Sequence, residues 1–360
     1  MTDVVVIGAG PAGSTVGQKI AVEGFDVLIL EKNQSPGKNK ICGGAISEKC
    51  FNDWEISAKI IEKKTSRVVV HFPEEKLEAP GNHSFTLFNR ENFDVLLAKK
   101  ALDSGAEILT STFAFDVRRD SDGITIYYKK FTNGEIKRVR ARLAIFADGT
   151  GTLASRKLGL GFKIKPAGTA LAAAYDLKWL ENSKCTIDFF FGEEISPFGY
   201  GWIFPKRDLI NIGVLCLQSE MKESIWKYLN RFVSSEKLSS REVLRAGSRL
   251  MPQSITSEIF GERVLVVGDA AGTADPIDGG GICNAIVSGN VASNVALEAL
   301  ENKKLTVDFL ANYEVLWKRT ENYRRFQRSY GYQQLALRTG VSLGTFLKRI
   351  GLFNQYIVIR

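Results

Sequence analysis

Conventional catalytic side chains are scarce in this sequence. It contains only two histidines, His71 and His83, and neither stands in a GxSxG or HExxH context. Because those patterns mark serine hydrolases and zinc proteases, nothing here indicates a hydrolytic triad. We expect both histidines to be structural. The reacting atoms should then belong to a bound cofactor, while the protein orients and desolvates the reactants.

Cysteine is also sparse and has no pattern. The five residues are scattered, odd in number and without CxxC spacing; they are Cys42, Cys50, Cys185, Cys216 and Cys283. This distribution argues against a disulfide framework, a zinc site and an iron–sulfur cluster, and it fits a reducing cytoplasm. We therefore expect no metal site.

Long hydrophobic runs are absent, although hydrophobic residues make up 44% of the 360 residues. No apolar run reaches the roughly 18 residues of a membrane span, and no basic region precedes the first strand-like stretch, Val4 to Ile7. We expect a cytoplasmic protein, at most peripheral on the cytoplasmic face of a membrane. The length allows two packed domains.

The positive charge is confined to one end of the chain. From Lys303 onward eleven bases stand against three acids, a difference that equals the net charge of +8 of the whole chain. The preceding residues are therefore close to neutral overall. A basic tail on a neutral body indicates anionic lipid or an acidic protein partner. No nucleic-acid module accompanies it, so we expect no nucleic-acid binding.

The N-terminal stretch predicts a dinucleotide site. Gly8, Gly10 and Gly13 form GxGxxG directly after an apolar run, and Glu31 follows the next such run, Val27 to Leu30. These glycines permit a tight turn and close approach of a pyrophosphate to a helix N-terminus, and the acid can accept bonds from ribose hydroxyls. Strand, helix and acid are all present, which favours a dinucleotide over a chance glycine loop.

Two later apolar runs end in the same way. Asp148 and Gly149 follow one, and Asp269 follows the other. Ligands bind outside the carboxyl ends of strands in a doubly wound sheet, so these ends can lie beside the first glycine turn. The alternative is that both are ordinary turns. After Asp269, three glycines precede an apolar stretch from Ile282 that predicts a helix, whose positive end would face the same ligand.

The central stretch SPFGYGWIFPKR, residues 196–207, interleaves aromatic residues with glycine. In an extended chain four aromatic side chains share one face; they are Phe198, Tyr200, Trp202 and Phe204. Neighbouring runs such as KCTIDFFFG and INIGVLCLQ predict an antiparallel sheet. Glycine in a strand marks close approach of a ligand or another backbone. The aromatics are either core or the wall of a cavity, and we favour the wall.

These motifs resemble FAD-dependent enzymes of the para-hydroxybenzoate hydroxylase type. The likeness rests on GxGxxG with its acid, FNRENFDVLL around Arg90 and Asp94, the ADG segment, and GDAAG followed by Pro276 and the glycines. CGG at residues 42–44 and PFGYGWIFP, which matches a PxxYxWxFP pattern, resemble the geranylgeranyl reductase family in particular. The resemblance covers residues 1 to about 300 and implies FAD as the cofactor.

The resemblance also implies roles for individual residues. At the nucleotide end of FAD it implies Gly8, Gly10, Ala12 and Gly13 at the pyrophosphate, Glu31 at the ribose and the backbone of Ala114 at the adenine. It implies Arg90 and Asp269 at the ribityl and phosphate groups, with Asp148 and Gly149 nearby. At the flavin end it implies Cys42, Gly43 and Ala45 beside the isoalloxazine, and Gly281 and Ile282 at its pyrimidine side. Cys42, Phe198, Tyr200, Trp202 and Phe204 would contact the substrate. No adjacent base is evident to activate Cys42, so we expect a contact there and assign no catalytic residue.

The expected fold is α/β, with a Rossmann-like FAD-binding domain on a parallel sheet, an antiparallel-sheet substrate domain and a helical C-terminal region. The FAD-binding domain would combine residues 1–60, 90–160 and 255–300. The substrate domain would take 61–89 and 161–254, and the basic helical region would take 301–360.

The resemblance implies a reductase that saturates isolated double bonds of a geranylgeranyl group on a lipid or diphosphate. The alternatives are an FAD-dependent monooxygenase of the same fold, a flavin electron carrier to quinone and a non-enzymatic flavin-binding protein. The carrier would need an iron–sulfur module, for which the cysteine spacing is absent, and the aromatic wall argues against a non-enzymatic role. Electrons would come from a ferredoxin-like carrier or from NAD(P)H.

The end of the chain predicts one amphipathic helix. Its apolar side chains recur at helical spacing; they are Leu343, Phe346, Leu347 and Ile350, extended by Phe353 and Tyr356. Such a helix either lies in the interface of an anionic membrane or packs on its own domain. The sequence leaves both alternatives open.

Overall fold

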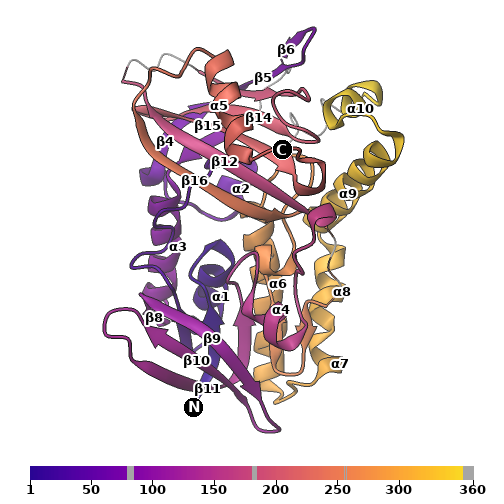
Figure 1. Ribbon diagram of the computed structural model, residues 1–360. Coiled ribbons are helices and arrows are strands. Elements are labelled where there is room, and N and C mark those ends of the chain that lie inside the picture. The colour runs from indigo at the N-terminus through magenta and orange to yellow at the C-terminus, as the bar shows by residue number, and fades with distance from the viewer. Residues whose placement is uncertain (79–84, 181–184, 255, 257, 352–360) are drawn as a thin grey trace.

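The computed structural model describes residues 1–78, 85–180, 185–254, 256 and 258–351. Two large sheets occupy the two halves of the molecule, and a row of C-terminal helices runs along one side of both (Figure 1). The N-terminus lies at the far end of the first half (Figure 1). The expected α/β fold, with a parallel sheet, a second sheet and C-terminal helices, is confirmed.

The first sheet has eight strands and a parallel core. Its strands are β1 (Thr2–Ile7), β2 (Val27–Leu30), β8 (Glu107–Leu109), β9 (Thr112–Arg119), β10 (Ile124–Lys130), β11 (Ile136–Phe146), β17 (Phe260–Gly261) and β18 (Val264–Val266). The order is β17-β18-β11-β1-β2-β8; β10 pairs antiparallel with β11, and β9 pairs antiparallel with β10. The last four residues of β1, Val4 to Ile7, are all apolar and buried, as is typical of a central strand in a parallel sheet.

The carboxyl ends of β1, β11 and β18 lie side by side. Ile7 pairs with Phe146, and Phe146 pairs with Val266, in parallel register. The three turns that follow therefore start at one edge of the sheet, so the prediction that these distant strand ends meet is confirmed. The helices of this half are α1 (Pro11–Ala21), α3 (Arg90–Asp103), α4 (Leu153–Leu158) and α6 (Ile282–Glu301).

The second sheet has seven strands in the order β16-β12-β15-β14-β13-β5-β6. Their bounds are β5 (Arg67–His71), β6 (Lys76–Glu78), β12 (Thr169–Lys178), β13 (Thr186–Phe190), β14 (Tyr200–Pro205), β15 (Leu209–Leu217) and β16 (Val243–Pro252). Neighbouring strands are antiparallel except β13 and β5, which run parallel. On its outer face Ile203 and Ile212 pack with α5 (Ile225–Ser235).

A small third sheet is formed by three strands between residues 45 and 88. It consists of β4 (Ile61–Thr65), β7 (Phe85–Phe88) and β3 (Ala45–Ser47), the last leading into α2 (Glu48–Asp53). Here β3, from the range predicted for FAD binding, pairs with β7 from the range predicted for the substrate domain. The domain boundaries themselves stay a prediction.

His71 is held by its neighbours at the end of β5. Its Nε2 lies 2.8 Å from Oδ1 of Asp188, and its ring stacks on Phe190 with 4.2 Å between centroids. These contacts agree with a structural role. His83 lies outside the described residues.

The C-terminal helices are α7 (Val307–Leu310), α8 (Asn312–Arg319), α9 (Glu321–Thr339) and α10 (Leu343–Arg349). The side chains of Leu343, Phe346 and Leu347 are buried in the same cluster as Tyr200 on the inner face of the second sheet. The apolar side of α10 therefore packs on its own domain, which corrects the membrane-facing alternative for these three residues. Phe353 and Tyr356 lie outside the described residues.

A buried ion cluster fastens the loop before Cys42 to α3. Arg90 donates from Nε and Nη2 to the two carboxylate oxygens of Asp94, each at 2.9 Å. Lys40 Nζ lies 3.2 Å from the same carboxylate, which is fully buried. Burial opposes ionisation of Asp94, but Arg90 and Lys40 outweigh it and lower the pKa of this carboxyl group.

We expect Asp94→Ala to lower the free energy of unfolding by about 3–5 kcal/mol, because it leaves two cations without their shared carboxylate. Asp103→Ala on the same helix is the matched control. It breaks an exposed pair with Lys99, whose side chains are 62% and 67% exposed, and should cost only about 0.3–0.5 kcal/mol. Urea unfolding followed by circular dichroism measures both. Equal losses in the two variants would contradict the prediction.

Candidate cofactor and substrate site

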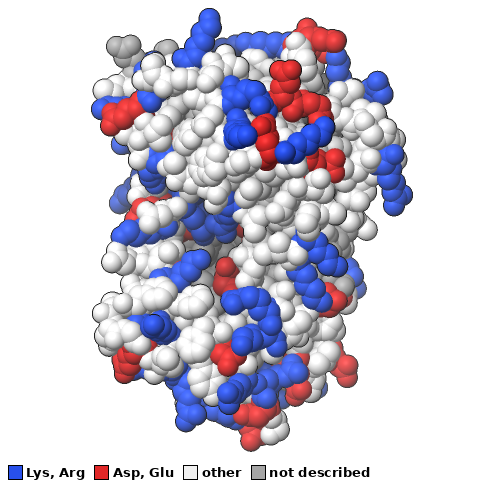
Figure 2. All heavy atoms as spheres, in the orientation of Figure 1, with Lys and Arg blue, Asp and Glu red and all other residues white. Residues whose placement is uncertain are grey.

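A cavity of about 740 Å³ extends from the shared edge of the parallel sheet to the inner face of the second sheet. Figure 2 shows the surface hollowed between the two halves, with Lys and Arg side chains around the hollow. Most residues predicted for the two sites line this one cavity; they are Gly8, Gly10, Ala12, Glu31, Cys42, Gly43, Ala45, Arg90, Ala114, Asp148, Gly149, Asp269, Gly281 and Ile282 for the cofactor, and Cys42, Tyr200, Trp202 and Phe204 for the substrate. The fold thus brings both sets together.

Two predicted residues do not line the cavity. Gly13 faces the glycine turn, where a Cβ would lie 1.9 Å from the carbonyl oxygen of Gly8, so it serves the close packing of α1. Phe198 precedes β14 and has a φ of +51°, which breaks the expected alternation before Tyr200. Its side chain is buried in the core. The wall therefore begins at Tyr200, two residues later than expected.

The first glycine turn leaves the N-terminus of α1 open toward the cavity. Gly10 is the N-cap and supplies no side-chain bond to the first N–H groups of the helix. Glu31 accepts hydrogen bonds from the N–H groups of Ala9 and Asn33, each at 2.9 Å, and so fixes the turn to the end of β2. Its oxygens keep lone pairs for ribose hydroxyls. Open N–H groups beside such a carboxylate fit the pyrophosphate and ribose of a dinucleotide.

Lys40 stands at this helix N-terminus, although sequence analysis did not identify it as a ligand. Its Nζ lies 3.4 Å from the position that a Cβ on Gly10 would take. Burial lowers the pKa of Lys40 to about 8; Asp94 opposes this shift, and Arg90 and Arg249 reinforce it. A cluster of cations at a positive helix end favours a bound anion. Spacing could not reveal it, because Lys40 meets Asp94 across 54 residues of sequence.

Cys42 has charged neighbours that the sequence did not disclose. Burial opposes ionisation of Arg90, but Asp94 above all raises the pKa of its guanidinium, which also interacts with the sulfur of Cys42. The buried ammonium of Lys206 also interacts with Cys42; burial lowers the pKa of Lys206, and Asp176 is the main group that opposes this shift. Two cationic side chains therefore lie near Cys42, and its role as a contact stays a prediction.

The carboxylate of Asp148 caps the start of α4. It accepts a hydrogen bond from the N–H of Leu153 at 2.7 Å and another from the hydroxyl of Thr152, at the start of α4. Burial raises the pKa of Asp148. Asp148 also lines the cavity, and its contact with the cofactor stays a prediction. Gly149, with a φ of +81°, brings its backbone along the cavity.

Asp269 and Gly281 meet at the start of α6. A Cβ on Gly281 would lie 3.2 Å from Oδ1 of Asp269, and Arg249 of β16 forms an ion pair with Asp269 at 3.5 Å. Gly281 is the N-cap of α6 and gives no side-chain cap, so a second open helix N-terminus lies at the cavity. Sequence analysis missed Arg249 because its strand carries no recognisable motif.

The aromatic wall directs its polar atoms into the protein. The hydroxyl of Tyr200 donates to the carbonyl oxygen of Asp278 at 2.6 Å, and Nε1 of Trp202 donates to Oδ1 of Asn211 at 2.7 Å. Phe204 completes the row. With both polar groups satisfied by protein partners, the aromatic rings offer the cavity apolar surface.

Small residues on the neighbouring strands leave space for these rings. Gly213 of β15 pairs with Trp202, and a Cβ there would lie 2.2 Å from Cζ2 of the indole. Ala172 and Ala174 of β12 extend the lining beyond it. The glycines of residues 196–207 themselves lie against protein, since a Cβ on Gly199 would lie 1.8 Å from the carbonyl oxygen of Leu215 and one on Gly201 would lie 2.9 Å from the ring of Phe232.

Within the described ranges, no helix combines the length and apolarity needed to cross a membrane. The same part of the chain holds no group of three or more His, Cys, Asp or Glu side chains that could bind a metal ion.

Two family models match the chain. Residues 1–178 match an FAD binding domain, and residues 169–249 match a geranylgeranyl reductase catalytic domain. The two matches overlap in β12, a strand of the second sheet. The first covers the open turn of α1, and the second covers the aromatic wall.

Curated relatives and solved structures match most of the chain. Digeranylgeranylglycerophospholipid reductase 3 of Methanosphaera stadtmanae is 32% identical over 325 residues, which is 86% of this chain and 81% of the relative. Digeranylgeranylglycerophospholipid reductase 2 of Methanothermobacter thermautotrophicus is 31% identical over 347 residues, or 92% and 87%.

The solved structure of a geranylgeranyl bacteriochlorophyll reductase-like protein from Thermoplasma acidophilum has a TM-score of 0.88 at 29% identity, covering 99% of this chain and 92% of that one. A flavin-dependent halogenase has a TM-score of 0.71 at 22% identity, covering 90% and 63%, and shares the fold alone. Together with the open dinucleotide turn, the family models and the relatives establish that this chain is an FAD-dependent oxidoreductase and belongs to the geranylgeranyl reductase family.

Proposed function

We propose that the protein saturates isolated double bonds of geranylgeranyl chains carried by a lipid or a diphosphate. The observation that carries this proposal is the apolar wall of Tyr200, Trp202 and Phe204 in the same cavity as two open helix N-termini. Each buried methylene contributes about 0.8 kcal/mol, so such a wall can hold a polyprenyl chain by contact area. The relatives named as digeranylgeranylglycerophospholipid reductases support a lipid-borne chain.

The two ends of the cavity would bind different molecules, FAD at one end and the isoprenoid chain at the other. Glu31, Lys40 and Asp269, with the N-termini of α1 and α6, would hold FAD. When bound and reduced, FAD would supply a hydride to one alkene carbon, and a proton would reach the other carbon. Trp202 and its neighbours would orient the chain and exclude water. This contribution matters because isolated alkenes lack an activating carbonyl group.

The partners follow from charge and substrate. Arg324 and Arg338 lie exposed on α9, and among the described residues neither forms an ion pair with an acid. This basic face supports a ferredoxin-like carrier as electron donor, with NAD(P)H as the alternative. It equally supports a peripheral contact with anionic lipid, through the outer face of α9 and not through the buried side of α10.

The proposed reaction is tested with the flavin reduced anaerobically and a geranylgeranyl lipid added. We expect mass spectrometry to show a gain of two hydrogens for each double bond reduced. Oxygen incorporation under aerobic turnover would instead establish the monooxygenase alternative. Electron transfer to a quinone without change in the lipid would establish the carrier.

FAD affinity should depend on the charge of Lys40. Since burial holds the pKa of Lys40 near 8, its ammonium is present below about pH 8 and lost above it, so FAD should bind more weakly as the pH rises through that value. Lys40→Met should weaken binding about 10- to 100-fold at pH 7 and flatten this dependence. Fluorescence titration of the apoprotein measures it, with Lys99→Met as control. Wild-type affinity and slope in Lys40→Met would refute the assignment.

The position of Trp202 should set which double bonds react. Gly213→Ala adds a methyl group where the indole lies, a strain of about 1–3 kcal/mol, and should displace the ring toward the cavity. We expect kcat/KM for the lipid to fall about 10-fold and the distribution of products to change, with the flavin spectrum kept. Gly331→Ala, where a Cβ would meet nothing within 4 Å, should behave as wild type. Loss of flavin from soluble Gly213→Ala protein would instead indicate a core role.

A further inference from the structure

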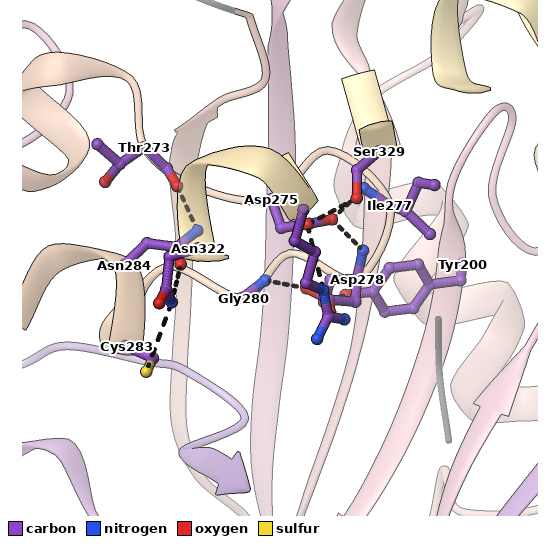
Figure 3. A network of polar contacts seen from close by, with 11 residues as sticks. Tyr200, Thr273, Asp275, Ile277, Asp278, Gly280, Cys283, Asn284, Asn322 and Ser329 are labelled. Atoms are coloured by element: carbon purple, nitrogen blue, oxygen red, sulfur yellow. Dashed lines mark hydrogen bonds and ion pairs between the residues drawn. The ribbon is translucent and has the colours of Figure 1, made fainter. Parts of the chain in front are cut away.

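Helix α9 contacts a loop that lines the cavity between the N-terminus of α6 and the aromatic wall. The loop runs from Asp275 to Gly281 and leads into α6. Its residues 278–281 line the cavity. Figure 3 shows Ser329 of α9, Asp275 and Asp278 of the loop, and Tyr200 of the wall within one polar network. The C-terminal region, for which sequence analysis found no motif, therefore reaches the site through this loop.

Asp278 joins three elements through three hydrogen bonds. Its Oδ2 accepts from Nη2 of Arg325 in α9 at 2.6 Å, and its Oδ1 accepts from the N–H of Gly280 at 2.7 Å. Its backbone oxygen accepts from the hydroxyl of Tyr200 at 2.6 Å. At Gly279 a Cβ would lie 2.7 Å from that hydroxyl, so the wall and the loop backbone are in close contact. A shift of Asp278 would therefore move Tyr200.

A second carboxylate, that of Asp275, also lies beside the guanidinium of Arg325. Asp275 is 1% exposed, and its Oδ2 accepts from the hydroxyl of Ser329 at 2.8 Å and lies 3.8 Å from Nε of Arg325. Its Oδ1 accepts from the N–H groups of Ile277 and Asp278 at 2.9 and 3.2 Å. Two carboxylates so close together repel each other unless a cation stands between them. Arg325 is the cation that faces both.

Helix α9 has other attachments that do not involve Arg325. Asn322 donates to Oδ1 of Asn284 at 2.9 Å, Gln333 donates to Oε1 of Gln253 at 2.9 Å, and Phe326 is buried in the core of the first half. Loss of the Arg325 side chain should therefore leave the helix docked while releasing Asp278. The contacts of Arg325 are thus separable from the general stability of the region.

We propose that Arg325 is a positioning residue for the substrate. By holding Asp278 it fixes the loop backbone against the hydroxyl of Tyr200, and so sets how deeply an isoprenoid chain enters beside the wall. This inference rests on the proposed reductase function. It makes the C-terminal helix part of the substrate-binding apparatus, acting through Asp278 and Tyr200 without contacting the chain itself.

The test compares Arg325→Met with Lys318→Met, which breaks an exposed i,i+4 pair with Glu314 in α8. In the anaerobic lipid assay Arg325→Met should keep FAD, raise KM about 10-fold with a smaller effect on kcat, and change the distribution of products. Arg325→Lys, which restores the charge, should recover part of this loss. Lys318→Met should match wild type.

A double-mutant cycle with Tyr200→Phe tests the route. If Arg325 acts through the hydroxyl of Tyr200, adding Arg325→Met to Tyr200→Phe should change KM and products by less than twofold. Additive effects of the two substitutions would overturn this route. If Arg325→Met does not fold, Arg325→Lys carries the same cycle, with a smaller expected shift.

The thermal midpoint gives a readout without substrate. Burial and then Asp278 raise the pKa of Asp275 to about 6, while Arg325 opposes this shift. A raised carboxyl pKa favours the folded state at low pH, and this contribution is lost as the pH rises through about 6. Removing Arg325 should raise the pKa of Asp275 further. The fall of the thermal midpoint with rising pH should therefore extend to higher pH in Arg325→Met, and should be unchanged in Lys318→Met.

The possible failures are distinguishable. If the wild type saturates the lipid while Arg325→Met equals Lys318→Met in KM and products, the positioning role is overturned and the reductase function stands. If the wild type forms no saturated product, the reductase function fails and the positioning role fails with it.

Discussion

The register of three parallel strands determines where the chemistry of this protein can occur. Ile7, Phe146 and Val266 end β1, β11 and β18 at the same level, so the chain turns three times at one edge of the sheet. Two of these turns lead to helices with glycine N-caps, α1 and α6, whose first N–H groups are left without side-chain partners. Such groups require an anion or water. The strand register thus produces a site for a long anionic cofactor.

At the other end of the cavity, the second sheet presents an apolar surface. Its inner face must stay apolar although it carries Tyr and Trp, and it does so because Asp278 and Asn211 accept their hydrogen bonds from behind. Asn211 in turn donates to Asp176 at 2.8 Å, and Asp176 pairs with Arg245 at 2.7 Å. A buried polar chain therefore keeps the indole edge satisfied. An apolar chain can lie against the rings without stranding a polar group.

The parts of the structure that were predictable from sequence are those where the backbone itself is constrained. Glycine turns after apolar runs, and the alternation from Tyr200 to Phe204, follow from local geometry and were recovered. Phe198 was placed on the strand because alternation does not reveal a residue in the left-handed region. The hydrogen bond from Leu153 to Asp148 was not predicted, because a turn and a helix cap use the same side chain. Lys40 and Arg249 could not be found, since their partners lie far away in sequence.

The C-terminal helices illustrate the same limit. Their positive charge suggested binding of an external partner, and their apolar spacing suggested an exposed amphipathic surface. In the structure, some of the charged and apolar side chains instead contact the rest of the protein. The side chains of Leu343, Phe346 and Leu347 are buried in the core beside the wall. Arg325 forms ion pairs with two carboxylates of the loop. A net charge counts a cation whether it faces solvent or an acid. Only the tertiary contacts separate the bases that remain for a partner from the one that holds the loop beside the site, and exposed bases remain on α8, α9 and α10 and just before α7.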